Sequence, residues 1–289
     1  MKKTKIICSI GPASRKYDVM KSMIENGMNV ARFNFSHGTH EEQRGRIMKL
    51  REVAERVGSP VAFLLDTKGP EMRLGKFLDK KVLLEEGKQF IITGRDVEGT
   101  ADICSVTHKN LPHEVAAGNR ILLSDGLVEL LVERVDGEDI VTTILNTGEV
   151  STGKRVAAPD VAVQMPFLSE KDIADIKFGV EMDMDFIAAS FVQRAADILA
   201  IRRVLEEVGG DMQIIAKIEN AEGVRNIDSI LRVADGVMVA RGDLGVEIPT
   251  EEVPVIQKML IKTFDIIFII MIFFPLHKEI IFRGKFLIL

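Results

Sequence analysis

The sequence repeats one pattern along most of its length: a short apolar run followed by a longer amphipathic segment. Such runs are typical of strands buried on both faces of a parallel sheet, and the segments between them have helical periodicity. The expected strands are Lys5–Ile10, Val30–Phe35, Val61–Leu65, Phe186–Ala189, Ile214–Ile218 and Gly236–Ala240. The expected helices are Asp18–Asn26, His40–Val57, Glu170–Gly179, Ala195–Val208 and Ala221–Val233. This order predicts an α/β fold with right-handed crossovers.

Polar residues at the ends of the apolar runs show where the repeat is interrupted. They are Ser9, Asn34, Asp66, Ser190, Glu219 and Asp243, separated by 25, 32, 124, 29 and 24 residues. One gap exceeds an ordinary βα unit by roughly 90 residues, which indicates a domain inserted after the third strand. Within this gap the β-rich segments are Lys81–Thr93, Arg120–Leu123, Leu127–Val135 and Ile140–Asn146, with Asp-Gly turns at 125–126 and 136–137.

The simplest fold class for this pattern is a (β/α)8-type TIM barrel that carries a small all-β barrel domain. Residues 1–69 and 166–261 are assigned to the TIM barrel and residues 70–165 to the insertion. A closed TIM barrel needs eight strands, and only six precede residue 262, so an incomplete barrel is expected. Open strand edges and an uncovered apolar interior favour aggregation, and we therefore expect low solubility.

Residues 262–289 differ in composition from the rest of the chain. Thr263–Leu289 contains eight Ile and six Phe, whereas the preceding 262 residues contain nine Phe. Because the segment has neither helical nor alternating periodicity, we interpret it as a shifted reading frame. The alternative is a membrane anchor, but the longest uncharged stretch, Ile266–Leu276, has 11 residues, and a spanning helix needs about 17–25. Membrane association is not expected.

Composition also limits the partners and the compartment. The chain has 43 acidic and 38 basic residues, a net charge of −5 and a single Tyr, so it lacks a basic, aromatic-lined surface for nucleic acid. Its two cysteines, Cys8 and Cys104, are far apart and lack metal-ligand spacing, as in proteins of reducing compartments. These features predict a cytoplasmic protein with no nucleic-acid partner.

The second and third strands end in oxygen-bearing side chains. Alternate residues of a strand point the same way, so Arg32, Asn34 and Ser36 share one face. Asp66 and Thr67 end the third strand. The four oxygen-bearing side chains together suit a hard monovalent cation. For Asn34 and Ser36 the alternative is ordinary loop capping.

The fifth and sixth strands end in charged residues. Lys217 and Glu219 are two apart and face one cavity, and Asp243 follows the next strand. Two carboxylates with water and substrate oxygens suit Mg²⁺ or Mn²⁺, and a lysine beside them can stabilise a developing phosphoryl or enolate charge. The alternative is a structural ion pair of Lys217 with either carboxylate. Gly242 and Gly245 would let backbone amides approach an anion, or simply form a turn.

Five motifs, in order and at similar spacing, together resemble pyruvate kinase. They are Lys5–Ser14, Arg32–Gly38, Asp66–Arg73, Lys217–Gly223 and Ala240–Gly245. The resemblance implies transfer of a phosphoryl group from phosphoenolpyruvate to ADP, which gives pyruvate and ATP in glycolysis, with Mg²⁺ (or Mn²⁺) and K⁺ as cofactors. It also implies that the inserted β domain is a mobile lid that excludes water during the transfer.

The resemblance also implies roles for individual residues. Arg32 and Lys217 match the catalytic, substrate-contacting residues of the family, and Lys217 would stabilise the transferring phosphoryl group. Further substrate contacts are implied for Ala240, Gly242 and Asp243. The implied metal ligands are Glu219 and Asp243 for Mg²⁺, and Asn34, Ser36, Asp66 and Thr67 for K⁺. Nucleotide contacts are implied for Asn34, His37, Arg73 and Lys154.

The motif similarity ends after residue 261. The family's Thr-Gln-Met-Leu motif, whose Thr belongs to the substrate site, does not occur, nor does the C-terminal domain that carries subunit contacts in the family homotetramer. Little or no activity is therefore expected of this chain. Two alternatives stay open: a non-catalytic fragment that binds substrate or an intact subunit, or merely misfolds, and a Mg²⁺-dependent barrel lyase acting on an enolate. The lyase alternative does not account for the monovalent-cation site.

Overall fold

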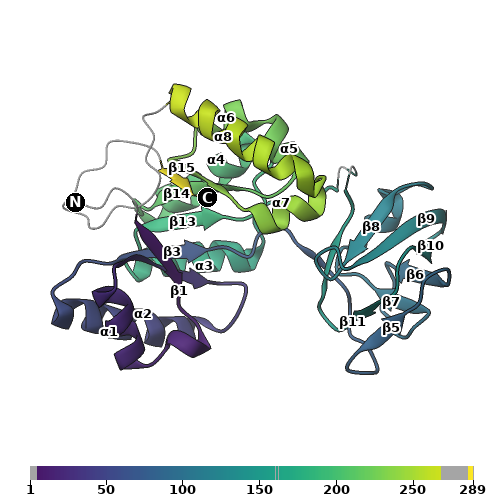
Figure 1. Cartoon of the computed structure of the whole chain (residues 1–289), viewed down its shortest axis with the longest axis horizontal. Coiled ribbons are helices and arrows are strands. Elements are labelled where there is room, and N and C mark those ends of the chain that lie inside the picture. The colour runs from purple at the N-terminus through teal and green to yellow at the C-terminus, as the bar shows by residue number, and fades with distance from the viewer. Residues whose placement is uncertain (1–4, 160, 162, 268–285, 289) are drawn as a thin grey trace. The chain divides into compact units, whose positions relative to one another are not determined.

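A computed structural model describes residues 5–159, 161, 163–267 and 286–288. The chain divides into two compact units (Figure 1). The first unit comprises Met1–Gly69, Phe167–Arg241 and Glu251–Leu289, and the second comprises Pro70–Pro166 and Gly242–Thr250. The second unit interrupts the first between β3 and the helix that follows residue 169.

The first unit is built on a parallel sheet with the strand order β1-β2-β3-β13-β14-β15-β16. The strands are β1 (Ile6–Ser9), β2 (Met28–Asn34), β3 (Ala62–Asp66), β13 (Phe186–Ala189), β14 (Gln213–Ile218), β15 (Gly236–Val239) and β16 (Phe286–Ile288). Buried apolar side chains from neighbouring strands, including Val30, Leu64, Ala188 and Ile215, pack in one cluster. A parallel sheet whose strands alternate with helices is the architecture of an α/β barrel.

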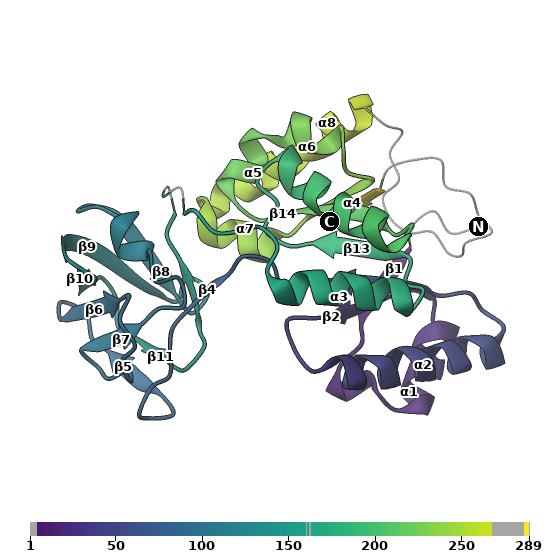
Figure 2. The ribbon, with the colours of Figure 1, turned by 180° about the vertical axis from the view of Figure 1, so that it is seen from behind.

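Helices follow the strands of this sheet. They are α1 (Tyr17–Glu25), α2 (His40–Val57), α3 (Glu170–Glu181), α4 (Ala195–Val208), α5 (Ala221–Arg225), α6 (Ile227–Leu231), α7 (Arg241–Glu247) and α8 (Val253–Ile267). Helix α1 packs against α2, and α3 against α4 (Figure 2). Thr39 and Ser169 begin α2 and α3 with capping boxes, in which Glu42 and Asp172 complete the reciprocal hydrogen bonds.

Two expected local structures differ from the observed ones. The helix predicted over Ala221–Val233 is two short helices that meet at Asn226. The Asn226 side-chain amide donates a 2.8 Å hydrogen bond to the backbone oxygen of Gln193, and asparagine favours such local alternatives to a continuous helix. The turn considered at Gly242 lies in the first turn of α7.

The change of composition at residue 262 lies within helix α8. Helix α8 continues through it to Ile267, with Leu260 and Phe264 buried. Six strands of this sheet precede residue 262, as predicted, and β16 adds a seventh strand, parallel to β15. Without β16, the outer edge of β15 would have unpaired backbone N–H and C=O groups, and β16 pairs with this edge. The rest of the expected tail, residues 268–285 and 289, lies outside the described residues.

The second unit consists mostly of β-strands. Its larger sheet has the order β4-β12-β8-β9-β10-β6-β7, and β11 pairs with β5. The strands are β4 (Met72–Arg73), β5 (Val82–Leu84), β6 (Gln89–Thr93), β7 (Ile103–Ser105), β8 (Arg120–Leu123), β9 (Val128–Asp136), β10 (Asp139–Ile144), β11 (Gly148–Val150) and β12 (Arg155–Ala157). Asp125, Gly126 and Gly137 have positive φ angles, as tight turns between antiparallel strands require.

None of the helices within the described ranges is long and apolar enough to cross a membrane.

Candidate active site

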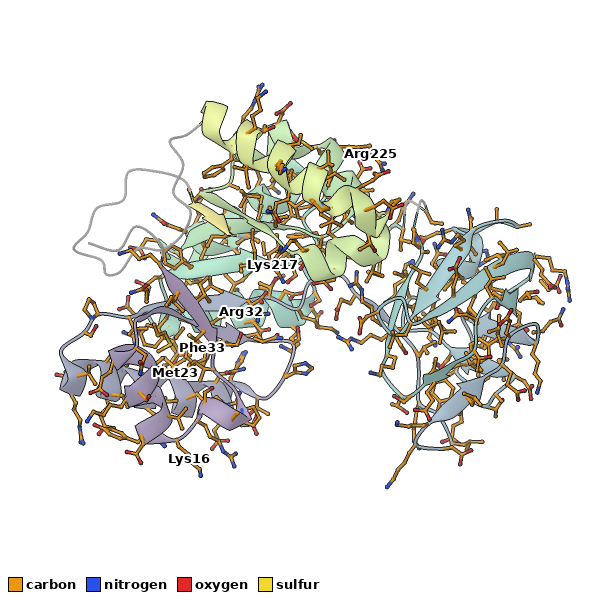
Figure 3. The ribbon with its side chains drawn as sticks, in the orientation of Figure 1. Lys16, Met23, Arg32, Phe33, Lys217 and Arg225 are labelled. Carbon is orange, nitrogen blue, oxygen red and sulfur yellow. The ribbon has the colours of Figure 1, made fainter. Side chains whose placement is uncertain are left out.

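Charged and polar side chains gather at the carboxyl ends of β2, β3, β13 and β14 in the first unit. Parallel strands present these ends at one edge of the sheet, and the register places Asn34 of β2 opposite Asp66 of β3. Arg32 projects from β2 and Lys217 from β14. Figure 3 shows Arg32 and Lys217 over the sheet of this unit, while Lys16 and Arg225 lie at its periphery.

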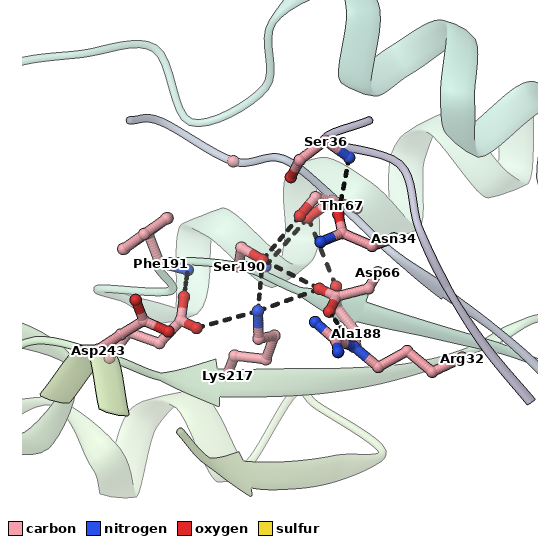
Figure 4. A network of polar contacts seen from close by, with 12 residues as sticks. Arg32, Asn34, Ser36, Asp66, Thr67, Ala188, Ser190, Phe191, Lys217 and Asp243 are labelled. Carbon is pink, nitrogen blue, oxygen red and sulfur yellow. Dashed lines mark hydrogen bonds and ion pairs between the residues drawn. The ribbon is translucent and has the colours of Figure 1, made fainter. Parts of the chain in front are cut away.

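Lys217 is at the centre of a buried polar network (Figure 4). Its Nζ lies 3.0 Å from Asp66 Oδ1 and 3.0 Å from Glu219 Oε1, and donates a 2.8 Å hydrogen bond to Ser190 Oγ. The side chains of Lys217, Asp66 and Glu219 are 10%, 2% and 1% exposed. A buried charge is tolerated only when it is paired and hydrogen-bonded, and this ammonium meets both conditions.

Asp66 connects Lys217 with the guanidinium of Arg32. Its Oδ2 accepts a 2.5 Å hydrogen bond from Arg32 Nε, and its Oδ1 accepts hydrogen bonds from Lys217 Nζ and, at 3.2 Å, from Ser190 Oγ. Arg32 Nη1 also donates a 2.8 Å hydrogen bond to Ser9 Oγ. The Arg32 side chain is 31% exposed, so its positive charge is accessible to an anion at the rim of the network.

The surroundings of Lys217 keep it positively charged. Burial is the largest influence on its pKa and lowers it, but the carboxylates of Asp66 and Glu219 outweigh burial and raise the pKa above the ordinary 10.5. Lys217 is therefore an ammonium at neutral pH. A fixed ammonium in a water-poor site can stabilise negative charge that develops on a bound phosphoryl group or enolate.

The four predicted monovalent-cation ligands lie together at the ends of β2 and β3 (Figure 4). The capping alternative also holds in part, because Asn34 Oδ1 accepts a 2.8 Å hydrogen bond from the backbone N–H of Ser36. Thr67 Oγ1 accepts a 3.0 Å hydrogen bond from the backbone N–H of Ser190. A set of one carboxylate, one amide and two hydroxyl oxygens is the donor chemistry of a hard cation, so these residues fit such an ion.

The two predicted Mg²⁺ ligands fall in different units. Glu219 belongs to the first unit, where its Oε2 accepts a 2.7 Å hydrogen bond from the backbone N–H of Phe191. Asp243 lies in α7 within the second unit, where Arg155 Nη1 donates a 2.6 Å hydrogen bond to its Oδ1. Carboxylate oxygens suit Mg²⁺. Over the described ranges no cluster of three or more His, Cys, Asp or Glu side chains could hold a metal, so a site shared by Glu219 and Asp243 stays a prediction.

The remaining predicted contact residues are spread over both units. Ala240 follows β15, and its backbone N–H donates a 3.3 Å hydrogen bond to the Ile218 oxygen. Gly242 is exposed, and a Cβ added to it would meet no atom within 4 Å, so its backbone is open to approach. His37 is exposed in the loop after β2, and Lys154 is exposed in the second unit.

Arg73 in β4 of the second unit is held by its neighbours. Its Nη2 lies 2.6 Å from Glu71 Oε2, and its Nη1 donates a 2.8 Å hydrogen bond to the Gly153 oxygen. The Arg73 guanidinium is thus paired with a carboxylate, and its nucleotide contact stays a prediction.

Comparison with known proteins identifies the family. The sequence matches "Pyruvate kinase, barrel domain" over residues 1–272. The chain belongs to the pyruvate kinase family. It is 55% identical to a pyruvate kinase of Geobacillus stearothermophilus and 51% identical to one of Staphylococcus aureus (strain MRSA252), over 264 residues in each case. These alignments cover 90% and 91% of this chain but 45% of each relative, so the chain spans less than half the length of those enzymes.

The match to the pyruvate kinase family extends past residue 261, where the recognisable motifs end. This agrees with α8, which continues to Ile267. Two residues with partners among the site residues, Ser190 and Arg155, were not predicted as functional. Ser190 directly follows β13, and Asp66 is the last residue of β3. This position at a strand end could have identified Ser190 as a site residue. Arg155 gave no signal, because 88 residues separate it from Asp243.

The raised pKa of Lys217 makes stability depend on pH in alkaline solution. Its charged form is favoured by folding, so this stabilisation is complete below about pH 10.5 and is lost as the pH rises through the raised pKa of the folded chain. We expect the free energy of unfolding to fall above pH 10.5 by up to about 1.4 kcal/mol per pH unit. Urea unfolding of wild type and Lys217→Met across this range measures the effect. Equal slopes for the two proteins would contradict it.

Proposed function

We propose that this chain carries the phosphoryl-transfer site of a pyruvate kinase, acting on phosphoenolpyruvate and ADP to give pyruvate and ATP. The observation that carries the proposal is the buried Lys217 ammonium between Asp66 and Glu219, with Arg32 at the rim. Phosphoryl transfer places negative charge on several oxygens, and fixed cations lower the energy of that state. The similarity to named pyruvate kinases over 264 residues supports the same reaction.

In this proposal the residues of the site bind the substrates and stabilise the charge that moves between them. Arg32, which is partly exposed, binds the phosphoryl group of phosphoenolpyruvate, while Asp66 holds the guanidinium in place through Nε. Lys217 stabilises the phosphoryl group as it moves. Ala240 and Gly242 contact the substrate through their backbones. The proposed nucleotide contacts are Asn34, His37, Arg73 and Lys154.

Two kinds of cation complete the proposed site. Glu219 and Asp243 would hold Mg²⁺ or Mn²⁺, with Asp243 also reaching the substrate, and Asn34, Ser36, Asp66 and Thr67 would hold K⁺. Divalent ions polarise phosphoryl and enolate oxygens and so assist the transfer. For Asp243, ion binding competes with the Arg155 guanidinium, which lies 2.6 Å from its Oδ1.

We also propose that residues 70–165 act as a β-barrel lid on a catalytic barrel formed by residues 1–69 and 166–261. The support is the compact, mostly β unit that includes Pro70–Pro166. A closing lid would keep water from the phosphoryl group, because hydrolysis competes with transfer to ADP. A cytoplasmic location is proposed on the basis of two free cysteines, Cys8 and Cys104.

The test is pyruvate formation measured by a lactate dehydrogenase coupled assay. The 289-residue chain is expected to turn over far more slowly than its relatives, because its sequence lacks the Thr-Gln-Met-Leu motif. A chimera of residues 1–261 with the remaining sequence of the Geobacillus stearothermophilus relative is expected to be active and to require ADP, Mg²⁺ and K⁺. Pyruvate formation without ADP would favour the lyase. A folded but inactive chimera would favour a non-catalytic role.

A further inference from the structure

The end of β2 and the loop after it carry two of the proposed K⁺ ligands, Asn34 and Ser36, and are tied to helix α2. Gln43, in the first turns of α2, donates from Nε2 to the backbone oxygen of Asn34 and to that of His37, each at 3.0 Å. One side chain therefore holds the peptide groups at both ends of residues 34–37. The proposed ligand Ser36 lies between these two points.

A second side chain holds the middle of the same loop. Lys171 of α3 donates from Nζ to the backbone oxygen of Phe35 at 2.7 Å, and the same atom lies 2.6 Å from Asp175 Oδ2. Asp175 is fully buried, and its Oδ1 lies 2.7 Å from His40 Nε2. The Asp175 carboxylate thus anchors the lysine that donates to the loop. Three of the four carbonyls in residues 34–37 are held from α2 and α3.

Gln43 is an exception on the buried face of α2. The other buried residues of this helix are Ile47, Leu50 and Val53, all apolar and spaced at helical intervals. Gln43 is 1% exposed, and burying an amide costs free energy unless it is hydrogen-bonded. Its two donor bonds both go to the loop backbone. The Gln43 amide therefore holds residues 34–37 through hydrogen bonds and does not contribute to the apolar packing of α2.

We propose that Gln43 and Lys171 are positioning residues of the monovalent-cation site and set its affinity for K⁺. The backbone has two soft dihedral angles per residue, so holding successive peptide planes fixes the directions of the Cα–Cβ bonds between them. Those directions aim the oxygens of Asn34 and Ser36. Contacts that orient ligands in this way typically change ion affinity about 10–100-fold. The inference rests on the proposed function, because it takes Asn34 and Ser36 as ligands.

The test uses the 289-residue chain and needs no catalytic activity. The midpoint of thermal unfolding is measured at increasing KCl, with tetramethylammonium chloride keeping the ionic strength constant, and the rise in midpoint gives the half-saturating K⁺ concentration. Gln43→Met keeps the side-chain length but removes both donors, and is expected to raise that concentration about tenfold. Lys171→Met, at a position where the side chain is 45% exposed, is expected to raise it less, and Lys171→Arg to restore part of the affinity.

Exposed lysines on the same two helices provide matched controls. Lys49→Met on α2 and Lys177→Met on α3 are expected to leave the half-saturating K⁺ concentration unchanged. If Gln43→Met and Lys171→Met lower the midpoint equally in both salts without changing that concentration, their role is only structural and the inference is overturned. If the wild-type midpoint does not respond to K⁺ at all, the proposed K⁺ site itself is wrong, and the inference fails with it.

Discussion

Replacing Asp66 with alanine is expected to lower the free energy of unfolding of the first unit by about 3–5 kcal/mol. The Asp66 carboxylate is 2% exposed and accepts hydrogen bonds from Arg32 Nε, Lys217 Nζ and Ser190 Oγ. Its removal leaves the buried Lys217 with Glu219 as its carboxylate partner and removes the ion pair of Arg32. Losing one member of a buried charge network is costly because the other members remain desolvated. Urea unfolding followed by circular dichroism measures the loss.

Two further variants separate charge from side-chain removal. Asp66→Asn keeps the shape of the side chain and one acceptor oxygen, and is expected to be less destabilising than alanine. Asp211→Ala, at an exposed position of the same unit, is expected to change the free energy of unfolding by less than about 0.5 kcal/mol. If Asp66→Ala matched Asp211→Ala, the network would add little to stability.

Replacing Lys217 with methionine is expected to reduce kcat of the chimera described above by about 10³-fold. Lys217 Nζ lies 3.0 Å from Asp66 Oδ1 and 3.0 Å from Glu219 Oε1. It supplies the ammonium of the described network. Methionine has a similar length but cannot stabilise a developing negative charge. Because the carboxylate of Glu219 remains, divalent-ion binding should persist. The coupled assay measures kcat, and Mn²⁺ binding followed by electron paramagnetic resonance measures the ion.

The matched control for turnover is Lys177→Met, which removes an exposed lysine from α3. It is expected to leave kcat and Mn²⁺ affinity unchanged. A Lys217→Met chimera with wild-type kcat would show that Lys217 has only the structural ion-pair role. Loss of turnover together with loss of Mn²⁺ binding would mean that the substitution disrupts the site and not specifically the transfer step.

Much of the first unit was predictable because its signals are local. Apolar runs and helical periodicity placed β13, α2 and α4 at their observed bounds, and strand-end polar residues predicted which side chains would meet. Asp66 was predicted as a cation ligand, but its ion pairs with Arg32 and Lys217 connect positions 34 and 151 residues apart. Neither periodicity nor local spacing encodes such partners.

The other features that the sequence did not predict also depend on contacts between distant segments. Gln43 looks like a surface residue in a polar run, and only the fold shows that it is buried against the loop after β2. The pairing of β16 with β15 joins segments about fifty residues apart, Gly236 with Phe286, in a way that sequence periodicity did not predict. Asn226 divides a helix through one hydrogen bond to the Gln193 oxygen, a partner supplied by another part of the unit.

The charges of the network have a consequence for how ligands enter. Arg32 and Lys217 contribute two positive charges, and Asp66 and Glu219 contribute two negative charges. The four groups therefore sum to zero, and their charges are already matched to one another. A ligand with several negative charges would make this enclosed region strongly anionic, which is costly where water is scarce. Such a ligand should enter together with its own metal ions, so the ionic composition of the solution would govern occupancy of the site as much as the ligand concentration does.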